Sequence, residues 1–146
     1  MPADFFIDIR LGVVFSKATG VFDSADAMDH MGRLQNHPDF RPDFNQLFDF
    51  RDVNTVMLSA GEVRQLAKQS IFSVSSHRAF VVPGDLEFGL ARMFGTYRDL
   101  EGESGIVSFR LMGKALAWLS LSVEPEPSMF AKLYTTATEA AQGTSS

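Results

Sequence analysis

The fold is decided by Leu47-Phe-Asp-Phe-Arg-Asp52, which a predicted short turn separates from Ser59-Ala-Gly-Glu62. The first part alternates loosely between apolar and charged side chains, which is typical of a strand in a sheet. The second part has a serine three residues before a glutamate, the capping-box pattern that opens a helix. A strand that leads into a helix is the repeating unit of an α/β domain, so we expect the rest of the chain to repeat this step.

Further strands and helices are predicted from composition and apolar spacing. The predicted strands cover residues 4–9, 13–18, 47–50, 78–82 and 106–109. The predicted helices cover residues 24–36, the segment from Ser59 to about Ile71, residues 85–100 and residues 114–119. A short turn joins the first two strands and helices separate the others. We therefore expect a single α/β domain whose mostly parallel central sheet of about five strands includes an antiparallel N-terminal hairpin, with four helices.

The ends of several elements have their own signals. Thr19-Gly20 is expected to close the second strand, and Asp23 or Ser24 to cap the helix that follows. Pro83-Gly84 is expected to end the fourth strand, and Asp85 to cap the next helix.

Composition limits the classes of function. The 146 residues are 45% hydrophobic and 21% charged, which fits one globular domain. The formal net charge of −5 disfavours nucleic acid or an anionic membrane surface as the main partner. The chain has no cysteine, which excludes disulfides, thiolate metal sites and cysteine nucleophiles. Neither a signal peptide nor a membrane-spanning run is recognised, so a cytoplasmic protein is expected.

The composition changes after Ser120, which divides the chain into a predicted domain over residues 1–120 and a linker and tail over residues 121–146. Val123-Glu-Pro-Glu-Pro127 is predicted to be extended, and residues 128–141 to form a short helix. The tail and the exposed edge of the N-terminal hairpin make a homodimer a further expectation.

Several stretches occur in an order shared with a known family. They are Thr19-Gly20 with the helix after it, Leu47-Phe-Asp-Phe-Arg-Asp-Val53, Arg78-Ala-Phe-Val-Val-Pro83, Phe88-Gly-Leu-Ala-Arg-Met-Phe94 and Ala115-Leu-Ala-Trp-Leu119. Together they resemble the small bacterial SpoIIAA-like proteins, whose domains are of the STAS/SEC14 type. The resemblance covers residues 5–120 and implies a single STAS-like domain.

The same resemblance implies a role in regulation. The better-known relatives are anti-sigma-factor antagonists, which bind a kinase-type partner and are switched by phosphorylation of one serine at a helix start. The nearest match here is Ser59, followed by Ala60-Gly61, with Met57 and Leu58 where that pattern has Asp and Ser. Ser59 is thus a candidate phosphoacceptor, because a helix N-terminus favours negative charge. Its alternative interpretation is a plain N-cap.

Polar residues also follow the predicted ends of the strands. Because ligands in open α/β sheets bind outside the carboxyl ends of the strands, these residues form a candidate binding rim. Its members are Asp52, Asn54, Gly84, Asp85 and Arg110. Asp, Asn and Gly are also the residues that turns favour, so turn formation is the alternative.

The sequence argues against an enzyme. His30, His37 and His77 do not have the spacing of metal ligands, and neither a nucleophile elbow nor a phosphate-binding glycine loop is recognised. No catalytic residue, metal or cofactor is predicted. Asp49, inside a predicted strand, is expected to have a local partner such as an arginine, because an unpaired buried charge is costly.

Two functions remain open. The first is a non-enzymatic regulatory or protein-interaction module with an unknown protein partner, whose surface includes Ser59 and the turn at residues 83–85. The second is a binding domain for a small molecule or lipid, with a shallow apolar pocket at the carboxyl ends of the strands. An interaction module should have an apolar surface patch near Ser59, whereas a binding domain should have an enclosed apolar pocket.

Overall fold

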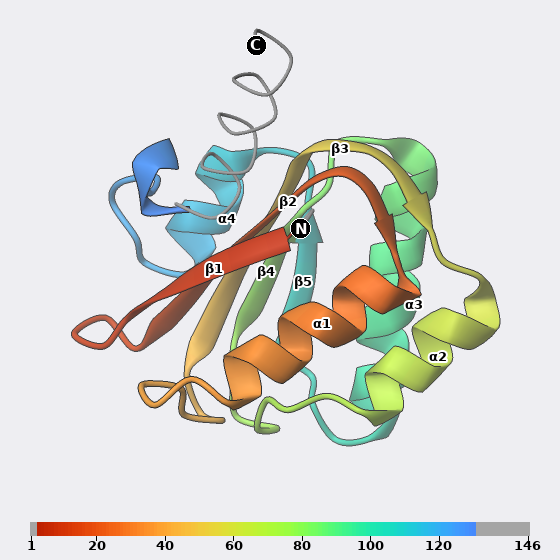
Figure 1. The fold of residues 1–146 in the computed structure, drawn as a ribbon, viewed down its shortest axis with the longest axis horizontal. Coiled ribbons are helices and arrows are strands. Elements are labelled where there is room, and N and C mark those ends of the chain that lie inside the picture. Colours follow the sequence, from red (N-terminus) through yellow and green to blue (C-terminus); the bar gives the residue numbers. More distant parts are fainter. Residues whose placement is uncertain (1–2, 131–146) are drawn as a thin grey trace, which may run out of the picture.

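Strands and helices alternate after an N-terminal hairpin, in the order that the sequence predicts (Figure 1). The structure is a computed structural model that describes residues 3–130. The strands are β1 (Ala3–Asp8), β2 (Val13–Asp23), β3 (Asn45–Met57), β4 (Arg78–Val81) and β5 (Ile106–Phe109). The helices are α1 (Ser24–Gln35), α2 (Ala60–Lys68), α3 (Asp85–Leu100) and α4 (Met112–Trp118), and a short 3-10 turn, η1, covers Pro127–Met129.

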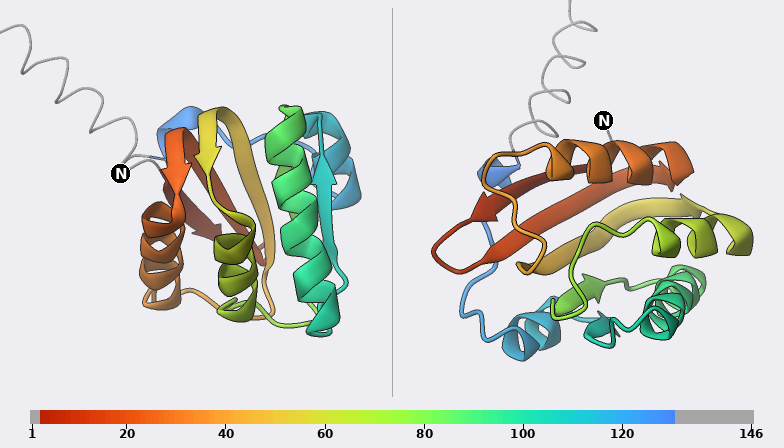
Figure 2. Two further views of the ribbon diagram at one scale, coloured as in Figure 1. Left: turned by 90° about the vertical axis from the view of Figure 1, so that its right-hand side faces the viewer. Right: turned by 90° about the horizontal axis from the view of Figure 1, so that it is seen from below.

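The strands form one sheet in the order β1-β2-β3-β4-β5. β1 pairs antiparallel with β2, and the other neighbouring strands pair in parallel. α1, α2 and α3 cover one face of the sheet, and α4 lies on the other face (Figure 2). This arrangement confirms the predicted α/β fold with its hairpin, five-stranded sheet and four helices. In the part of the chain that the structure describes, no helix is long and apolar enough to cross a membrane.

Alternation along the strands divides the side chains between the two faces. In β3, Phe48 joins the core cluster beneath the three helices, whereas Leu47 joins the cluster beneath α4. β4 is in register with β3, and Phe48 lies opposite Phe80, which belongs to the same cluster. The face toward α1, α2 and α3 therefore carries neighbouring phenylalanines, which form one wall of the site described below.

Two strands are longer than predicted. β2 does not close at Thr19-Gly20, because Gly20 adopts a φ of 67° that glycine tolerates and the pairing with β3 shifts register there. After this irregularity β2 continues to Asp23, and β3 continues beside it to Met57. The predicted end of β2 at Thr19-Gly20 is therefore wrong, because the glycine marks a bulge. The predicted turn after Asp52 is also wrong, because β3 continues through this residue.

The helix starts are built in two ways. α1 and α2 begin with capping boxes; in the second, the Ser59 hydroxyl accepts a hydrogen bond from the Glu62 N–H at 3.1 Å, and the Glu62 carboxylate accepts one from the Ser59 N–H at 2.9 Å. α3 differs from the prediction, because its N-cap is Gly84 rather than Asp85 and no side chain caps it. The Asp85 carboxylate forms an ion pair with Arg110 instead.

Residues 121–130 lie against the side of the sheet that carries α4. Phe130 is buried in the core cluster on that side, and Glu124 forms an ion pair with Arg51. The stretch that the sequence assigns to a linker thus contacts the domain through Glu124 and Phe130. The rest of the helix predicted at 128–141 lies outside the described residues.

Candidate functional site

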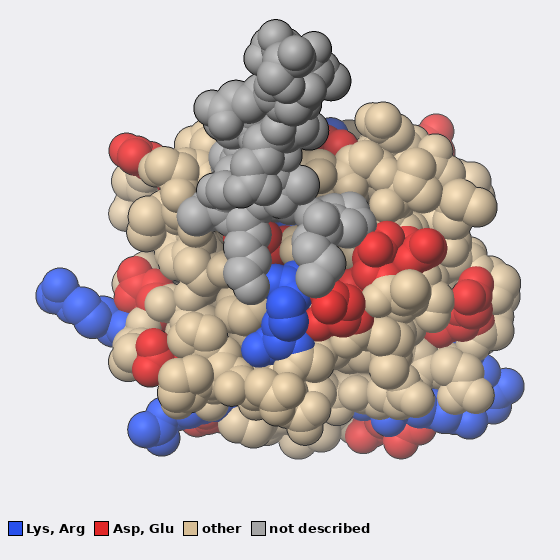
Figure 3. All heavy atoms as spheres, viewed as in Figure 1, with Lys and Arg blue, Asp and Glu red and all other residues tan. Residues whose placement is uncertain are grey.

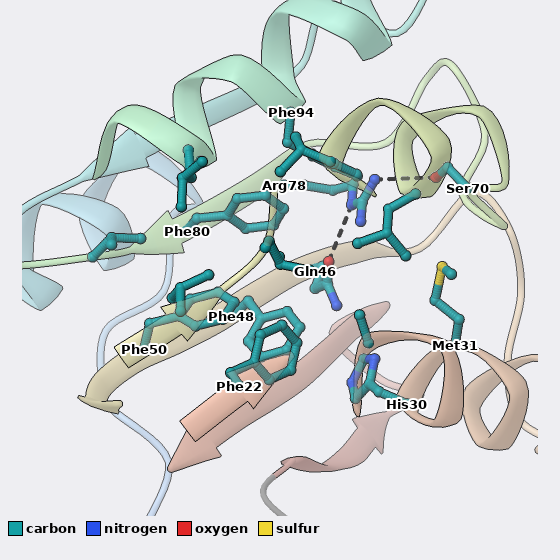
Figure 4. Close-up of a pocket in the computed structure, with 18 of the residues that line it drawn as sticks. Phe22, His30, Met31, Gln46, Phe48, Phe50, Ser70, Arg78, Phe80 and Phe94 are labelled. Carbon is teal, nitrogen blue, oxygen red and sulfur yellow. Dashed lines mark hydrogen bonds between the residues drawn. The ribbon is translucent and has the colours of Figure 1, made fainter. Parts of the chain in front are cut away.

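A cavity of about 110 Å³ lies between the sheet and α1, α2 and α3 (Figure 4). Side chains of β3 and β4 form its floor, and side chains of the three helices cover it. It reaches from Val82, just beyond the carboxyl end of β4, to Arg78, the first residue of that strand. The cavity therefore runs along the strands beneath the helices, whereas the sequence places a shallow pocket only at the carboxyl ends.

Aromatic rings make up much of the cavity wall. Phe48 and Phe50 are stacked with ring centroids 4.3 Å apart, and Phe22 meets Phe50 edge to face at 5.4 Å. Phe80 meets Phe48 edge to face at 6.2 Å. Such edge and offset contacts stabilise aromatic clusters beyond the burial of area alone. This part of the wall offers an apolar surface to anything inside the cavity.

One end of the cavity is polar, and its central group is the guanidinium of Arg78. In Figure 4, Arg78, Gln46 and Ser70 converge at this end. The Arg78 Nε donates to the Gln46 Oε1 at 3.0 Å, and its Nη1 donates to the Ser70 Oγ at 3.2 Å. The guanidinium also lies 4.2 Å from the ring centroid of Phe72, a cation–π distance. These contacts fix the guanidinium in place at the end of an otherwise apolar space.

A buried ionic cluster lies behind Arg78. The Arg78 Nη1 is 3.4 Å from the Glu103 Oε1, and the Arg98 Nε is 2.7 Å from the same oxygen. Arg98 also donates to the carbonyl of Ala67 at 3.0 Å. Burial, opposed by the charge of Glu103 and assisted by that of Arg98, lowers the pKa of Arg78 to about 10. Arg78 is therefore still a cation at neutral pH, in a site where two arginines share one carboxylate.

His30 connects α1 to this polar end. Its Nε2 is 2.9 Å from the Ser16 Oγ, which accepts a second hydrogen bond from the Gln46 Nε2 at 3.1 Å. Burial, followed by the positive charges of Arg33 and Arg78, lowers the pKa of His30 to about 3. The imidazole is therefore neutral near pH 7, and the Ser16 hydroxyl can donate its proton to the Nε2.

The residues predicted as a rim take separate places. Gly84, Asp85 and Arg110 come together: Arg110 donates to the carbonyl of Pro83 at 3.1 Å, pairs with Asp85 and lies over the Phe88 ring at 4.3 Å. These contacts connect the carboxyl end of β4 to the residue after β5. They form an exposed clamp around the start of α3 rather than part of the cavity wall.

Asp52 and Asn54 lie within β3, because the strand continues past them. Asp52 pairs with Lys17 at 2.9 Å, and Lys17 is also 3.5 Å from Asp49. Asp49 has the predicted local arginine, because Arg51 contacts both of its carboxylate oxygens. Asn54 is exposed. Asp52 thus belongs to a charge cluster between β2 and β3.

Ser59 is exposed at the start of α2, where it lines an open hollow that also includes Met28 of α1. Its hydroxyl is already used by the capping box. On the face shown in Figure 3, acidic and uncharged residues separate the described basic side chains, so they do not form a continuous basic patch there. Among residues 3–130, no group of three or more His, Asp or Glu side chains is arranged to hold a metal ion.

The sequence reasoning missed the residues at the polar end of the cavity. Arg78 does carry a signal, because it is the one charge in the apolar strand Arg78-Ala-Phe-Val-Val82 and shares its side of the strand with Phe80. A charge on the inward side of a buried strand needs a partner or a function. Glu103, in the loop before β5, has no comparable signal in the sequence.

Comparison with known proteins gives several similar chains among the solved structures, and one of these structures has a described fold. It is that of an uncharacterized protein from the DUF3478 family with a SpoIIAA-like fold, from Shewanella loihica PV-4. The alignment has 19% sequence identity and a TM-score of 0.48, and covers 73% of this chain and 83% of the other. No protein-family model and no curated protein matches the chain. The similar structure has the SpoIIAA-like fold that the sequence resembles.

Proposed function

We propose that this protein is a non-enzymatic binding domain that holds one small apolar molecule between the sheet and α1, α2 and α3. The observation that carries the proposal is the cavity of about 110 Å³ with its largely apolar wall. Protein interiors are close-packed, and voids larger than a water molecule are few. A space of this size, lined by side chains from three helices and a sheet, has the form of a ligand pocket.

The size of the cavity limits the ligand. An apolar cavity of about 150 Å³ stays dry and binds benzene. A space of about 110 Å³ therefore suits a single ring or a chain of about six carbons. A membrane phospholipid with two long acyl chains is much larger than this space.

The polar groups in the wall are not arranged for proton transfer. Arg78 donates to Gln46 and Ser70, and His30 bonds to Ser16. A general base works best with a pKa near the operating pH, and burial holds the pKa of His30 at about 3. This arrangement favours binding over catalysis.

Filling the cavity should block binding. Ala91 of α3 lines the cavity, and Ala91→Leu is expected to occupy part of it. We expect the variant to lose at least tenfold in affinity for toluene, measured by NMR titration of backbone amide shifts. Because filling a cavity removes a packing defect, we also expect the free energy of unfolding to rise by about 0.5–1 kcal/mol.

The matched control is Ala117→Leu on α4, an exposed position on the other side of the sheet. It should leave toluene binding unchanged. The proposal fails if toluene does not bind, or if it shifts the same amides in the Ala91→Leu variant as in the unchanged protein.

The second candidate function is the regulatory or protein-interaction module, and one observation favours it. Met28, which lines the same hollow as Ser59, is 44% exposed, and Met57, two residues before Ser59 in the sequence, is 61% exposed. Exposed methionines beside a modifiable serine are suited to a protein partner. A phosphate on Ser59 would lie next to the Glu62 carboxylate and open the capping box by charge repulsion.

Intact-mass measurement of protein purified from its own host tests this second function. A mass increase of one phosphate that maps to Ser59 is the expected result if the switch operates. An unmodified Ser59 in every growth condition tested would remove the phospho-switch. The cytoplasmic location and the homodimer remain predictions from the sequence.

A further inference from the structure

The two ends of the cavity differ in chemistry. The phenylalanines and aliphatic side chains lie along most of its length, whereas Arg78, Gln46 and Ser70 form one end. The other charged residue in the wall is Glu87, in the first turn of α3 beyond the carboxyl end of β4. Arg78 is at the amino end of β4, so the two charges lie toward opposite ends of the strand. A ligand that matches this wall has an apolar body and one polar group.

The charges around Arg78 are not balanced. Arg78 is 6% exposed, Arg98 7% and Glu103 0%, so two buried cations face one buried anion. The shared carboxylate is much closer to Arg98, at 2.7 Å, than to Arg78, at 3.4 Å. Gln46 and Ser70, the other acceptors of Arg78, are neutral. A buried charge without a full counter-charge is costly, and here the excess positive charge is on the arginine that faces the cavity.

The Arg78 guanidinium also has N–H donors that form no hydrogen bond within the described residues. Its Nε and Nη1 make the hydrogen bonds to Gln46, Ser70 and Glu103. Within residues 3–130, no side chain or carbonyl accepts a hydrogen bond from the Nη2, whereas the one fully buried side-chain atom without a partner is the Glu103 Oε2. An arginine presents five N–H donors in a planar fork, and buried donors are normally satisfied. The Nη2 donors are therefore available to a group inside the cavity.

We propose that the ligand is a small monocarboxylate, with its apolar body of about five to seven carbons along the phenylalanines and its carboxylate on the guanidinium of Arg78. This inference rests on the proposed binding function and names its ligand class. One negative charge matches the one excess positive charge of the cluster. A planar carboxylate also fits the guanidinium fork, and hydrogen bonds between two ionised groups are among the strongest. A phosphate monoester would bring nearly two negative charges into a site that has only one excess positive charge to balance them.

The test compares ligands that differ only in the head group, by calorimetric titration of the full chain at pH 7. The probes are hexanoate, hexanamide, hexyl phosphate and toluene. Hexanamide has the shape of hexanoate without its charge. We expect hexanoate to bind at least tenfold more tightly than hexanamide, and hexyl phosphate to bind more weakly than hexanoate.

Variants assign the effect to one residue. Arg78→Met removes the charge and keeps a long side chain, and it should reduce hexanoate affinity at least tenfold while leaving hexanamide affinity within about twofold. Arg92→Met, at an exposed arginine of α3, is the matched control and should change neither affinity. If Arg78→Met does not fold, the comparison of the four probes with the unchanged protein decides the question.

The outcomes separate the two proposals. If toluene binds but hexanoate is no tighter than hexanamide, the carboxylate assignment is overturned and the binding function stands. The same assignment is overturned if hexyl phosphate binds more tightly than hexanoate, or if a folded Arg78→Met variant keeps its hexanoate affinity. If toluene does not bind, the binding function itself fails.

Discussion

Glu103→Gln is expected to lower the free energy of unfolding by about 3–5 kcal/mol. Glu103 is fully buried, and its Oε1 is the shared acceptor of Arg78 and Arg98. Glutamine keeps the size and one acceptor oxygen but removes the only negative charge of the cluster. Two buried cations would then remain without a counter-charge, which is the costly way to break a buried ion pair. Urea unfolding of the two proteins, followed by circular dichroism, measures the difference.

The control for this prediction is Glu101→Gln, two residues earlier and exposed. Substitutions on the surface usually change stability by less than about 0.5 kcal/mol. Equal and small effects of the two substitutions would show that the buried carboxylate does not hold the arginines in place.

His30→Gln is expected to make the protein more resistant to acid. Burial and the charges of Arg33 and Arg78 lower the pKa of His30 from 6.5 to about 3, whereas the nearby Asp29 raises it. Between these values the unfolded chain binds a proton at His30 that the folded protein does not bind. Stability therefore falls as the pH decreases, and the contribution of this histidine between pH 7 and pH 4 is about 3 kcal/mol.

Glutamine does not titrate in this range and can still bond to Ser16. We expect the loss of unfolding free energy between pH 7 and pH 4 to be smaller in His30→Gln than in the unchanged protein by about 3 kcal/mol. Urea unfolding at each pH gives the values. His77→Gln, the same substitution at an exposed histidine, is measured as the control. Parallel pH profiles for all three proteins would contradict the prediction.

Much of the fold could be predicted because its signals are local. The apolar stretches, the Ser59–Glu62 capping box and the short hairpin connection are each read over a few residues, and together they give the right order of elements. The lengths of β2 and β3 could not be predicted in the same way. They depend on the pairing between the two strands, which continues past the irregularity at Gly20. When each segment is considered alone, this glycine is interpreted as the end of the strand.

The cavity could not be predicted for a related reason. Its walls come from β3, β4 and three helices that are distant in the sequence, and the space between them is set by how those elements pack. Arg78 is visible as a charge at the start of an apolar strand, but its partners are not. Gln46, Ser70 and Glu103 lie 32, 8 and 25 residues away from it.

The order of the strands has a consequence for how the chain folds during synthesis. Each strand after the first pairs with the strand that precedes it in the sequence. The ribosome releases the N-terminal part first, at about 5–20 residues per second, and contacts that are near in sequence form fastest. The sheet can therefore grow by adding one strand at a time to an edge that already exists. Phe130 follows all five strands in the chain, so we expect it to join the core cluster beneath α4 after the sheet has formed.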